Sequence, residues 1–299
     1  MPRSSPAAIR TQGLTKRFGK VLALDALDLE VGQGEVFGFL GPNGAGKTTT
    51  IRLLLHLIHA SAGRAWIMGI PVTDVAQAHR HVGYVAGDVA LWPQLTGQEI
   101  LGLLGNLSGS VDGSYRDELV QRLDLDPTRR IRTLSKGNRQ KVALIAALMH
   151  RPDVLLLDEP TAGLEPLMEA EFQQIVRECT HRGQTVFLSS HILDEVEDLC
   201  QRVALLRAGR LVELAPLDEL RHRDLAVFDV VLDGPAVSFA DLPAVVAEQH
   251  IDGVLRLSVR GSPAPLLARL GQLPVRSLRS RESDLESVFL DLYGMADRR

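Results

Sequence analysis

The stretch GPNGAGKTT, residues 41–49, brings glycines, a lysine and hydroxyl side chains together over a very short distance. Its spacing Gly-x-x-x-x-Gly-Lys-Thr is typical of a P-loop, whose glycines let backbone N–H groups turn toward phosphate oxygens. The lysine then bridges the β- and γ-phosphates, and the threonine hydroxyl holds Mg²⁺. A glycine-rich turn without a ligand is the alternative interpretation. We predict that a nucleotide binds to Gly41, Pro42, Asn43, Gly44, Ala45, Gly46, Lys47, Thr48 and Thr49.

A pair of carboxylates ends the segment VLLLDEP, where four apolar residues lead directly into Asp158 and Glu159. Burying both carboxylates without partners would be costly. A metal ion bound to Asp158 removes that cost, and a polarised water gives Glu159 a role as general base. Many strands end in acidic turns, so the pair gains its meaning from the P-loop upstream. We predict Thr48 and Asp158 as Mg²⁺ ligands and Glu159 as the catalytic base.

A histidine follows a third apolar segment, TVFLSSH, and stands just past its end as His191. A lone histidine is more often a packed or surface residue, which is the alternative here. His191, however, occupies the same position after a strand as Lys47 and Asp158. Ligands of open α/β sheets gather beyond the carboxyl ends of the strands. We therefore predict that His191 contacts the γ-phosphate and is catalytic together with Lys47.

The segment LSKGNRQ, residues 134–140, is a second candidate anion site. Its serine and glycine precede the apolar run KVALIAALM, as expected for the N-terminus of a helix that receives an anion. Ser135 acting as a simple N-cap of a helix over 142–149 is the alternative. One nucleotide would fill only the P-loop, so a second phosphate-binding segment in the same chain calls for an explanation.

Apolar runs place these residues in a fold of strands and helices. Residues 36–40 predict a short strand before the P-loop, and residues 51–58 predict a helix after it. The continuous apolar runs at 154–157 and 186–188 are typical of strands buried on both faces of a parallel sheet. The candidate residues would then meet at one edge of that sheet. The predicted fold class is α/β.

A helical insertion is expected from Tyr84 to Met149, between the P-loop and Asp158. Thr96 and Glu99 have the spacing of a capping box at the start of one of its helices. The segment before that helix contains Leu91 and Trp92, which we expect to be exposed and to mark a docking surface.

A different pattern begins beyond Glu213 and predicts a small α/β module without a catalytic cluster. Alternating apolar residues predict its strands, and helical spacing predicts its helices. The expected strands are 226–232, 253–259 and 275–280, the expected helices are 239–249 and 263–273, and a last amphipathic helix follows over 283–294, capped by Ser283.

Composition limits the function classes. A chain of 299 residues predicts one large or two unequal domains. The net charge of −4 argues against a protein that binds nucleic acid by neutralising phosphates. Cys179 and Cys200 lack ligand-type spacing and are expected to be reduced thiols. No apolar run approaches the roughly 18 residues of a membrane span, so we expect a soluble chain whose membrane role comes through a partner.

Taken together, the P-loop, LSKGNRQ about twenty residues before LLLDEP, and SSH resemble the ATP-binding subunit of ABC transporters over roughly residues 9–214. The resemblance implies a P-loop NTPase (ABC ATPase) core over 1–217, with a helical signature subdomain at about 84–149 and a small accessory α/β domain over 218–299. LSKGNRQ resembles the family's signature motif. In this family two subunits pair head to tail, and the signature helix of one closes over the ATP of the other. Ser135 and Gly137 would thus contact the partner's nucleotide.

Further residues are assigned by the same resemblance. Phe18 stands where the family has an aromatic residue that stacks on adenine, with a role in a strand core as its alternative. Residues 161–166 resemble the D-loop of the dimer interface, although aspartate is usual where Glu165 stands. The segment VGYVAGDVALWPQLT lacks the usual glutamine that touches Mg²⁺. Asp88 is our candidate substitute, and Gln94 is a second one.

The variant signature sequence, with Lys136 in place of a glycine, resembles subunits of ABC-2-type exporters, including the daunorubicin-resistance group. This implies ATP and Mg²⁺ as cofactors, an ABC-2-type integral membrane permease and a second copy of the chain as partners, and a peripheral location on the cytoplasmic face of the cell membrane. Export of a small hydrophobic compound or drug follows, with no nucleic acid partner. The alternatives are a soluble ABC ATPase acting on DNA or ribosomes, and a P-loop kinase or GTPase, for which no Asn-Lys-x-Asp segment is present.

Overall fold

A six-stranded sheet carries the candidate residues in the computed structural model, which describes residues 7–109, 111–221, 225–234, 237–251 and 253–282. The chain divides into two units, Met1–Leu214 and Ala215–Arg299. Five neighbouring strands of the sheet, from β9 to β6 in the order given below, pair in parallel and are lined by apolar residues, as predicted for an α/β fold. The strand order is β10 (Arg210–Pro216), β9 (Arg202–Arg207), β3 (Val36–Leu40), β8 (Thr185–Ser190), β7 (Val154–Asp158) and β6 (Val82–Val85).

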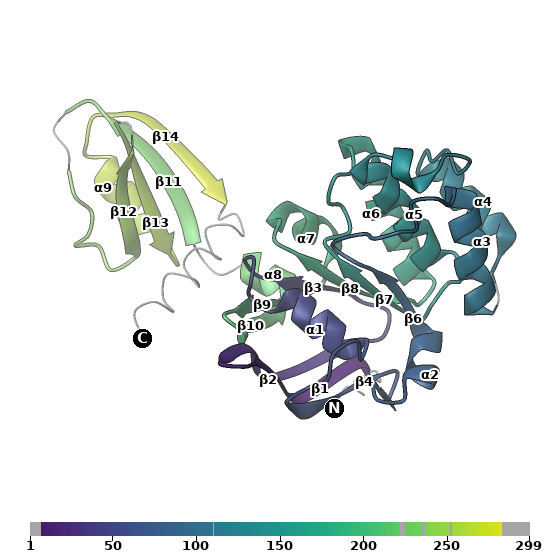
Figure 1. Cartoon of the computed structure of the whole chain (residues 1–299). Helices are drawn as coiled ribbons and strands as arrows, with labels where there is room; N and C mark the ends of the chain where they lie inside the picture. The colour runs from purple at the N-terminus through teal and green to yellow at the C-terminus, as the bar shows by residue number, and fades with distance from the viewer. Residues whose placement is uncertain (1–6, 110, 222–224, 235–236, 252, 283–299) are drawn as a thin grey trace. The chain divides into compact units, whose positions relative to one another are not determined.

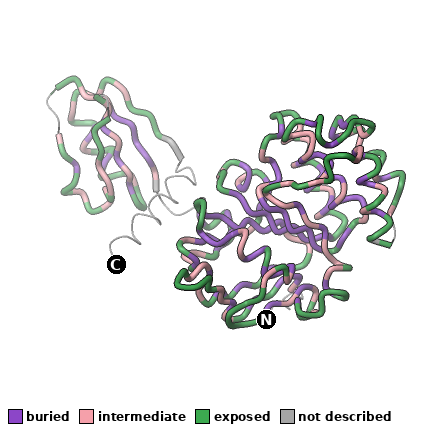
Figure 2. The backbone as a smooth tube through the Cα atoms, viewed as in Figure 1, coloured by how far each residue is buried: buried purple, intermediate pink, exposed green. Residues whose placement is uncertain are grey.

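A second, antiparallel sheet packs with the first around one helix. Its order is β2 (Val21–Gly32), β1 (Ala7–Phe18), β4 (Ala62–Ile67) and β5 (Ile70–Pro71). Helix α1 (Lys47–Leu54) contacts β2 and β4 on one side and β7 on the other. Apolar side chains of both sheets and of α1 form one buried cluster. In Figure 2 most of the backbone of the central strands is coloured as buried. This packing fixes the P-loop, because α1 begins at Lys47.

The helix after the P-loop differs from the prediction of residues 51–58. It begins four residues earlier, at Lys47, and ends at Leu54. His56 then adopts a left-handed backbone conformation with φ of 52°, and the Leu57 amide bonds back to Arg52. A left-handed residue ends an α-helix, so the apolar residues Leu57 and Ile58 lie in the following turn.

Three helices form the predicted insertion: α3 (Gly97–Ser108), α4 (Gly113–Arg122) and α5 (Lys136–Leu148). The expected start at Tyr84 is wrong, because Tyr84 belongs to β6 and pairs with Leu156 of β7. The capping box is confirmed, since Thr96 and Glu99 each bond the backbone of the other. Trp92 is 53% exposed as expected, whereas Leu91 is only partly exposed.

The remaining elements of the first unit frame the sheet (Figure 1). Helices α6 (Pro166–His181) and α7 (Leu193–Leu199) contact β8, and α7 also contacts β3. A short helix α2 (Val75–Ala78) with the 3-10 turn His79–His81 precedes β6, and the 3-10 turn Ile131–Thr133 precedes α5. Cys179 and Cys200 are free and buried. No helix in the described part of the chain is long and apolar enough to cross a membrane.

In the residues that the structure describes, the second unit has a four-stranded antiparallel sheet with helix α9 packed on it. The order is β12 (Val245–Ile251), β13 (Val254–Arg260), β11 (Leu225–Leu232) and β14 (Val275–Glu282), with helix α9 (Ala264–Leu270) and helix α8 (Leu217–Arg221) near its start. The predicted helix over 239–249 is wrong. Its second half forms β12, where Val245 and Val246 favour an extended backbone and β13 supplies hydrogen bonds. The predicted helix over 283–294, with its cap Ser283, lies outside the described residues.

Candidate functional site

The P-loop is held in shape by close backbone packing. Gly46, the N-cap of α1, has a φ of 112°, and a β-carbon there would lie 2.7 Å from the Ala23 carbonyl oxygen. A β-carbon on Gly41 would lie 2.4 Å from the Leu206 carbonyl oxygen. Such approaches exclude any side chain. The loop thus exposes backbone N–H groups at the start of a helix, which is the arrangement that binds phosphate.

The P-loop borders a cavity of about 140 Å³. Lys47 projects from the first turn of α1, is 5% exposed, and donates a hydrogen bond of 2.6 Å to the Gly41 carbonyl. Burial lowers the pKa of Lys47, and the nearby carboxylates Glu159 and Asp158 oppose that shift. The cavity is lined by Ala23, Pro42, Asn43, Gly44, Gly46, Lys47, Thr48, Thr49 and Glu159.

Asp158 ends β7 and is buried, with 2% of its surface exposed. Its carboxylate accepts a 2.5 Å hydrogen bond from the hydroxyl of Ser189, its register partner on β8. On the other side lies Gly87, whose missing β-carbon would stand 3.5 Å from the Asp158 carboxylate. Asp88, the next residue, is exposed. Gly87, rather than Asp88, is therefore the residue whose backbone lies against the Asp158 carboxylate.

Glu159 takes an uncommon backbone conformation, with a φ of 48°. Its N–H donates to the Ser189 carbonyl at 3.0 Å, which fixes the turn after β7 to the end of β8. This turn directs the side chain toward two cations or potential cations. Nδ1 of His191 lies 3.1 Å from a Glu159 carboxylate oxygen, and Nζ of Lys47 lies 3.8 Å from the same oxygen. Positive φ in a non-glycine residue often marks a functional site.

The three predicted strand ends therefore meet. Lys47 follows β3, Glu159 follows β7 and His191 follows β8, and these strands are neighbours in the parallel sheet. Glu159 is 30% exposed and His191 is 46% exposed, so both can contact a bound ligand. The arrangement places an acid–base carboxylate, an imidazole and an ammonium group within one small site, which suits proton abstraction beside a negatively charged group.

Phe18 lies at the tip of the β1–β2 hairpin and is 49% exposed. The alternative of a strand-core role is wrong, because half of the side chain faces solvent. Nζ of Lys16 lies 4.8 Å above its ring centroid. Ala23, on the strand that follows the hairpin turn, lines the phosphate cavity. An exposed aromatic face on this hairpin is available for stacking.

Ser135 is the N-cap of α5, which begins at Lys136 rather than at residue 142. Its hydroxyl accepts a hydrogen bond from the Asn138 N–H at 3.2 Å, so the N-cap interpretation holds for the isolated chain. Ser135 is exposed, which leaves the helix N-terminus open to an external anion. Gly137 packs against the backbone of Gly163, and a β-carbon on Gly137 would lie 2.2 Å from its carbonyl oxygen.

A metal ion at this site would need oxygen ligands from the bound nucleotide as well as from the protein. The described residues contain no group of three or more histidine, cysteine, aspartate or glutamate side chains that could hold a metal. Asp158 and the hydroxyl of Thr48, which lines the phosphate cavity, are hard oxygen donors. Mg²⁺ suits this set, because it is usually bound by one or two protein oxygens together with phosphate oxygens and water.

Sequence reasoning missed Glu195 of α7. This carboxylate is buried and accepts hydrogen bonds from the hydroxyls of Thr161 and Ser190. Thr161 belongs to the loop that carries Glu159, and Ser190 is the last residue of β8, directly before His191. The sequence signal was weak, since an acid in the first turn of a helix is ordinarily a solvated residue that favours the helix dipole.

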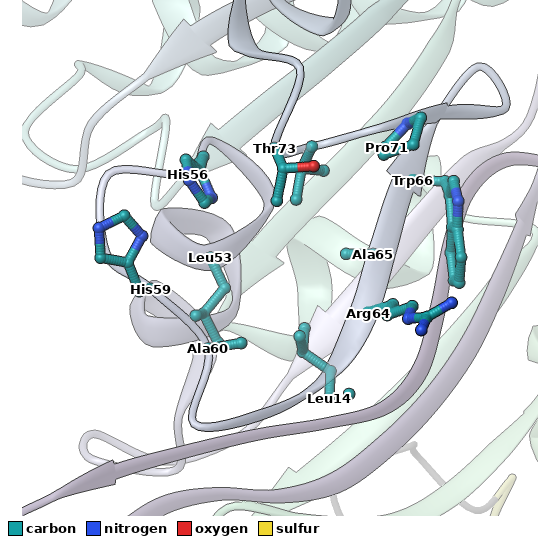
Figure 3. Close-up of a pocket in the computed structure, with 12 residues that line it drawn as sticks. Leu14, Leu53, His56, His59, Ala60, Arg64, Ala65, Trp66, Pro71 and Thr73 are labelled. Atoms are coloured by element: carbon teal, nitrogen blue, oxygen red, sulfur yellow. The ribbon is translucent and has the colours of Figure 1, made fainter.

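Two other hollows lie away from the phosphate cavity. One, of about 500 Å³, is bordered by the end of α1 and by β4, with His56 and His59 facing Arg64 and Trp66 in Figure 3. It shares no residue with the phosphate cavity. The other is a groove of about 800 Å³ lined by residues of α2, β6, α3 and α5, including Tyr84 and Leu107, and by His79 and His150 beside them.

Comparisons with known proteins agree with this geometry. A family model described as ABC transporter matches residues 24–162. The daunorubicin resistance ATP-binding protein DrrA3 of Streptomyces coeruleorubidus is 38% identical, over 98% of this chain and 97% of that protein. The bacitracin transport ATP-binding protein BcrA of Bacillus licheniformis is 32% identical, over 96% and 97% of the two chains.

Solved structures are similar over about 70% of the chain. An ATP-binding subunit of an ABC transporter is 28% identical, with a TM-score of 0.67, covering 72% of this chain and 92% of its own. A dimeric ATP-binding cassette in a post-hydrolysis state, bound to ADP and Pi, is 25% identical with a TM-score of 0.63, covering 70% of this chain and 98% of its own.

Proposed function

Because the chain belongs to the ABC transporter family of ATP-binding subunits and is therefore an ATPase, we propose that it powers efflux of a small hydrophobic compound through a partner membrane permease. The observation that carries this proposal is the convergence of Lys47, Glu159 and His191 at the ends of neighbouring strands beside the P-loop. The direction of transport is supported by the two relatives named for daunorubicin resistance and bacitracin transport, which align along nearly the whole chain.

ATP is held from two sides. The exposed ring of Phe18 stacks on adenine, and the P-loop N–H groups and Lys47 hold the phosphates. On binding, the Lys47 ammonium exchanges its bond to the Gly41 carbonyl for phosphate oxygens. Thr48 and Asp158 would hold Mg²⁺, which would neutralise phosphate charge. Asp88 would help to hold the same ion through one of the waters that Mg²⁺ retains.

Hydrolysis uses the groups around the carboxylate of Glu159. Glu159 orients a water molecule and accepts its proton as the water attacks the γ-phosphate. His191 and Lys47 lie 3.1 and 3.8 Å from that carboxylate and stabilise the negative charge that develops on the phosphoryl group. The turn that fixes the Glu159 backbone to Ser189 keeps these groups aligned before the nucleotide arrives.

A second copy of the chain completes the site in a head-to-tail dimer. Ser135 and the Gly137 backbone at the N-terminus of α5 contact the γ-phosphate of the ATP held by the partner's P-loop. This role explains why the N-cap of α5 is exposed and why the chain has a second anion-binding helix end. Loss of the γ-phosphate removes the ligand that joins the two copies, so hydrolysis opens the dimer.

The permease docks on exposed apolar residues of the helical insertion and of the segment that precedes it. Trp92 is 53% exposed and Leu107, which lines the groove, is 74% exposed. Exposed apolar residues beside a groove of this size fit a partner helix of an ABC-2-type permease. The chain would then lie peripherally on the cytoplasmic face of the membrane. The net charge of −4 makes a nucleic acid partner unfavourable.

Replacing Glu159 with glutamine tests the proposal. The amide keeps the size of the side chain but cannot accept a proton, so Glu159→Gln should bind ATP and form a stable dimer with almost no turnover. Phosphate release, nucleotide binding and dimer mass would be measured on the same preparation. Full turnover in Glu159→Gln would refute the assignment of Glu159 as the base.

Trp92→Ala should retain the ATPase activity of the isolated chain but lose its stimulation by the co-purified permease.

A further inference from the structure

We propose that Glu195 is a positioning residue that holds the loop of Glu159 and the loop of His191 in register for hydrolysis. Glu195 lies in the first turn of α7 and does not line the phosphate cavity. It acts through the two loops that follow β7 and β8. The inference rests on the proposed function, since it concerns the same reaction.

The two oxygens of the Glu195 carboxylate accept hydrogen bonds from two different segments, the loop after β7 and the end of β8. Oε1 accepts a hydrogen bond from the Thr161 hydroxyl, which lies two residues beyond Glu159. Oε2 accepts a hydrogen bond of 2.7 Å from the Ser190 hydroxyl, which directly precedes His191. A single rigid carboxylate therefore bridges the segments that carry the proposed base and the proposed imidazole.

The Ser190 hydroxyl also fixes the backbone on both sides of His191. While it donates to Glu195, its oxygen accepts the N–H of Ile192 at 2.9 Å. His191 thus lies between Ser190 and Ile192, which are joined to each other by this hydrogen bond. On the other loop, the Glu159 N–H is bonded to the Ser189 carbonyl. The cross-links at Ser189 and at Glu195 leave little freedom for Glu159 and His191 to move apart.

Because the Glu195 carboxylate is buried, it needs the hydrogen bonds from Thr161 and Ser190. Glu195 is 9% exposed, and within the described part of the chain it forms no ion pair. A buried carboxylate is costly unless hydrogen bonds satisfy it. Thr161 and Ser190 supply these bonds and are themselves buried, at 6% and 1% exposure. Water cannot easily replace either partner, so removing the carboxylate frees both loops at once.

The consequence is a defect in the chemical step rather than in ATP binding. Phe18 and the P-loop remain untouched, so the affinity for ATP stays near the wild-type value. Misplacing a reacting group by about 1 Å can cost about a hundredfold in rate. We expect the kcat of Glu195→Ala to fall by about tenfold to a hundredfold, and that of Glu195→Gln to fall less, because the amide keeps one acceptor oxygen.

The experiment measures kcat, KM and nucleotide affinity of the full chain for Glu195→Ala and Glu195→Gln. Asp194→Ala is the matched control, because Asp194 is an exposed carboxylate in the same helical turn. Thermal unfolding shows whether each variant is folded, and Glu195→Gln keeps the test valid should Glu195→Ala unfold. The expected result is a lower kcat with unchanged ATP affinity in both Glu195 variants and wild-type behaviour in Asp194→Ala.

A double-mutant cycle separates positioning from general stability. When His191 is already alanine, Glu195→Gln should cost less than it does in the wild type, because one of the groups it positions is gone. Equal costs in both backgrounds, or an unchanged kcat in Glu195→Ala, would overturn the inference. These outcomes leave the proposed function intact, which fails separately if Glu159→Gln retains full turnover.

Discussion

Gly137 and Gly163 are in direct backbone contact, so close that a β-carbon on Gly137 would lie 2.2 Å from the Gly163 carbonyl oxygen. Gly137 is in the first turn of α5, and Gly163 lies in the loop that follows Glu159. The helix end proposed to bind the partner's phosphate is thus packed directly on the loop of the proposed catalytic base. A change in one therefore reaches the other within the same chain.

Substituting Gly137 tests this packing. Gly137→Ala forces the two backbones apart, and overpacking of this kind costs about 1–3 kcal/mol of unfolding free energy. ATPase activity should fall more than ATP binding, since the P-loop is not involved. Gly102→Ala is the control: Gly102 lies in α3 with no atom within 4 Å of its missing β-carbon, so alanine should stabilise the helix slightly. Chemical denaturation measures the unfolding free energy of both variants. Equal values for Gly137→Ala and Gly102→Ala would contradict the close contact at Gly137.

Lys47 is predicted to lower the unfolding free energy of the nucleotide-free chain while it contributes to ATP binding. Its side chain is 5% exposed, and burial lowers its pKa from the ordinary value of 10.5. Lys47→Met should lose ATP affinity by about 10- to 100-fold, because a charge-assisted hydrogen bond is worth about 1.5–3 kcal/mol. The nucleotide-free variant should nevertheless be at least as stable as the wild type. Isothermal titration and thermal unfolding measure the two effects, and a variant that loses stability without ATP would contradict the prediction.

The same pKa shift predicts a dependence on pH. Because the pKa of Lys47 is lower in the folded chain than in the unfolded one, the unfolded chain binds more protons between the lowered value and 10.5. Unfolding free energy contributed by this group therefore rises with pH across that window. The stability difference between Lys47→Met and the wild type should shrink as pH rises toward 10.5. A difference that grows with pH would show the opposite sign.

Arg122 joins the helical insertion to α6. Its guanidinium, 19% exposed, forms hydrogen bonds with Glu171 and Glu178, at 2.5–2.9 Å. These bonds lower the pKa of Glu178 from 4.5. Arg122→Ala should lower the unfolding free energy at neutral pH by about 1–3 kcal/mol. Solvent screens this partly exposed group, which favours the lower end of that range. Arg116→Ala, which removes the exposed pair with Asp117, should change it by less than about 0.5 kcal/mol.

Acid should remove the advantage of the wild-type Arg122. The lowered pKa of Glu178 contributes stability above pH 4.5, which is lost as pH falls through the lowered value. The unfolding curves of Arg122→Ala and the wild type should therefore converge at low pH. A constant difference over the whole range would show that Arg122 stabilises by packing alone.

The proposed metal ligands can be tested through the Mg²⁺ dependence of turnover. Asp88→Ala should raise the Mg²⁺ concentration for half-maximal ATPase activity by a few fold, on the order of 1 kcal/mol for one water-mediated contact. Asp158→Asn should abolish activity at any Mg²⁺ concentration tested. An Asp88→Ala curve that superimposes on the wild type would remove Asp88 from the metal site, leaving the position at Gly87 to water.

The strand ends were predictable from the sequence because parallel strands that are buried on both faces consist of continuous apolar runs. Each run before Lys47, Asp158 and His191 corresponds to a strand, and the carboxyl ends of parallel strands meet at one edge. Local chemistry also identified the capping box at Thr96. Here a short-range pattern and the tertiary structure agree.

Other features depend on contacts that no local pattern contains. The segment 239–249 has a helical spacing of apolar residues, yet pairing with β13 turns its second half into a strand. The helix after the P-loop ends early because His56 takes a left-handed conformation. Glu195 reads as a surface acid of a helix, and only the fold brings Thr161 and Ser190 to its two oxygens.

Turnover per chain, measured against the concentration of the isolated chain, tests most directly whether two copies build each active centre. Turnover per chain should fall on dilution as the dimer dissociates, and Ser135→Glu, which places a negative charge at the N-terminus of α5, should suppress it at every concentration. Constant turnover per chain at dilutions where light scattering finds only monomer, together with wild-type activity of Ser135→Glu, would contradict it.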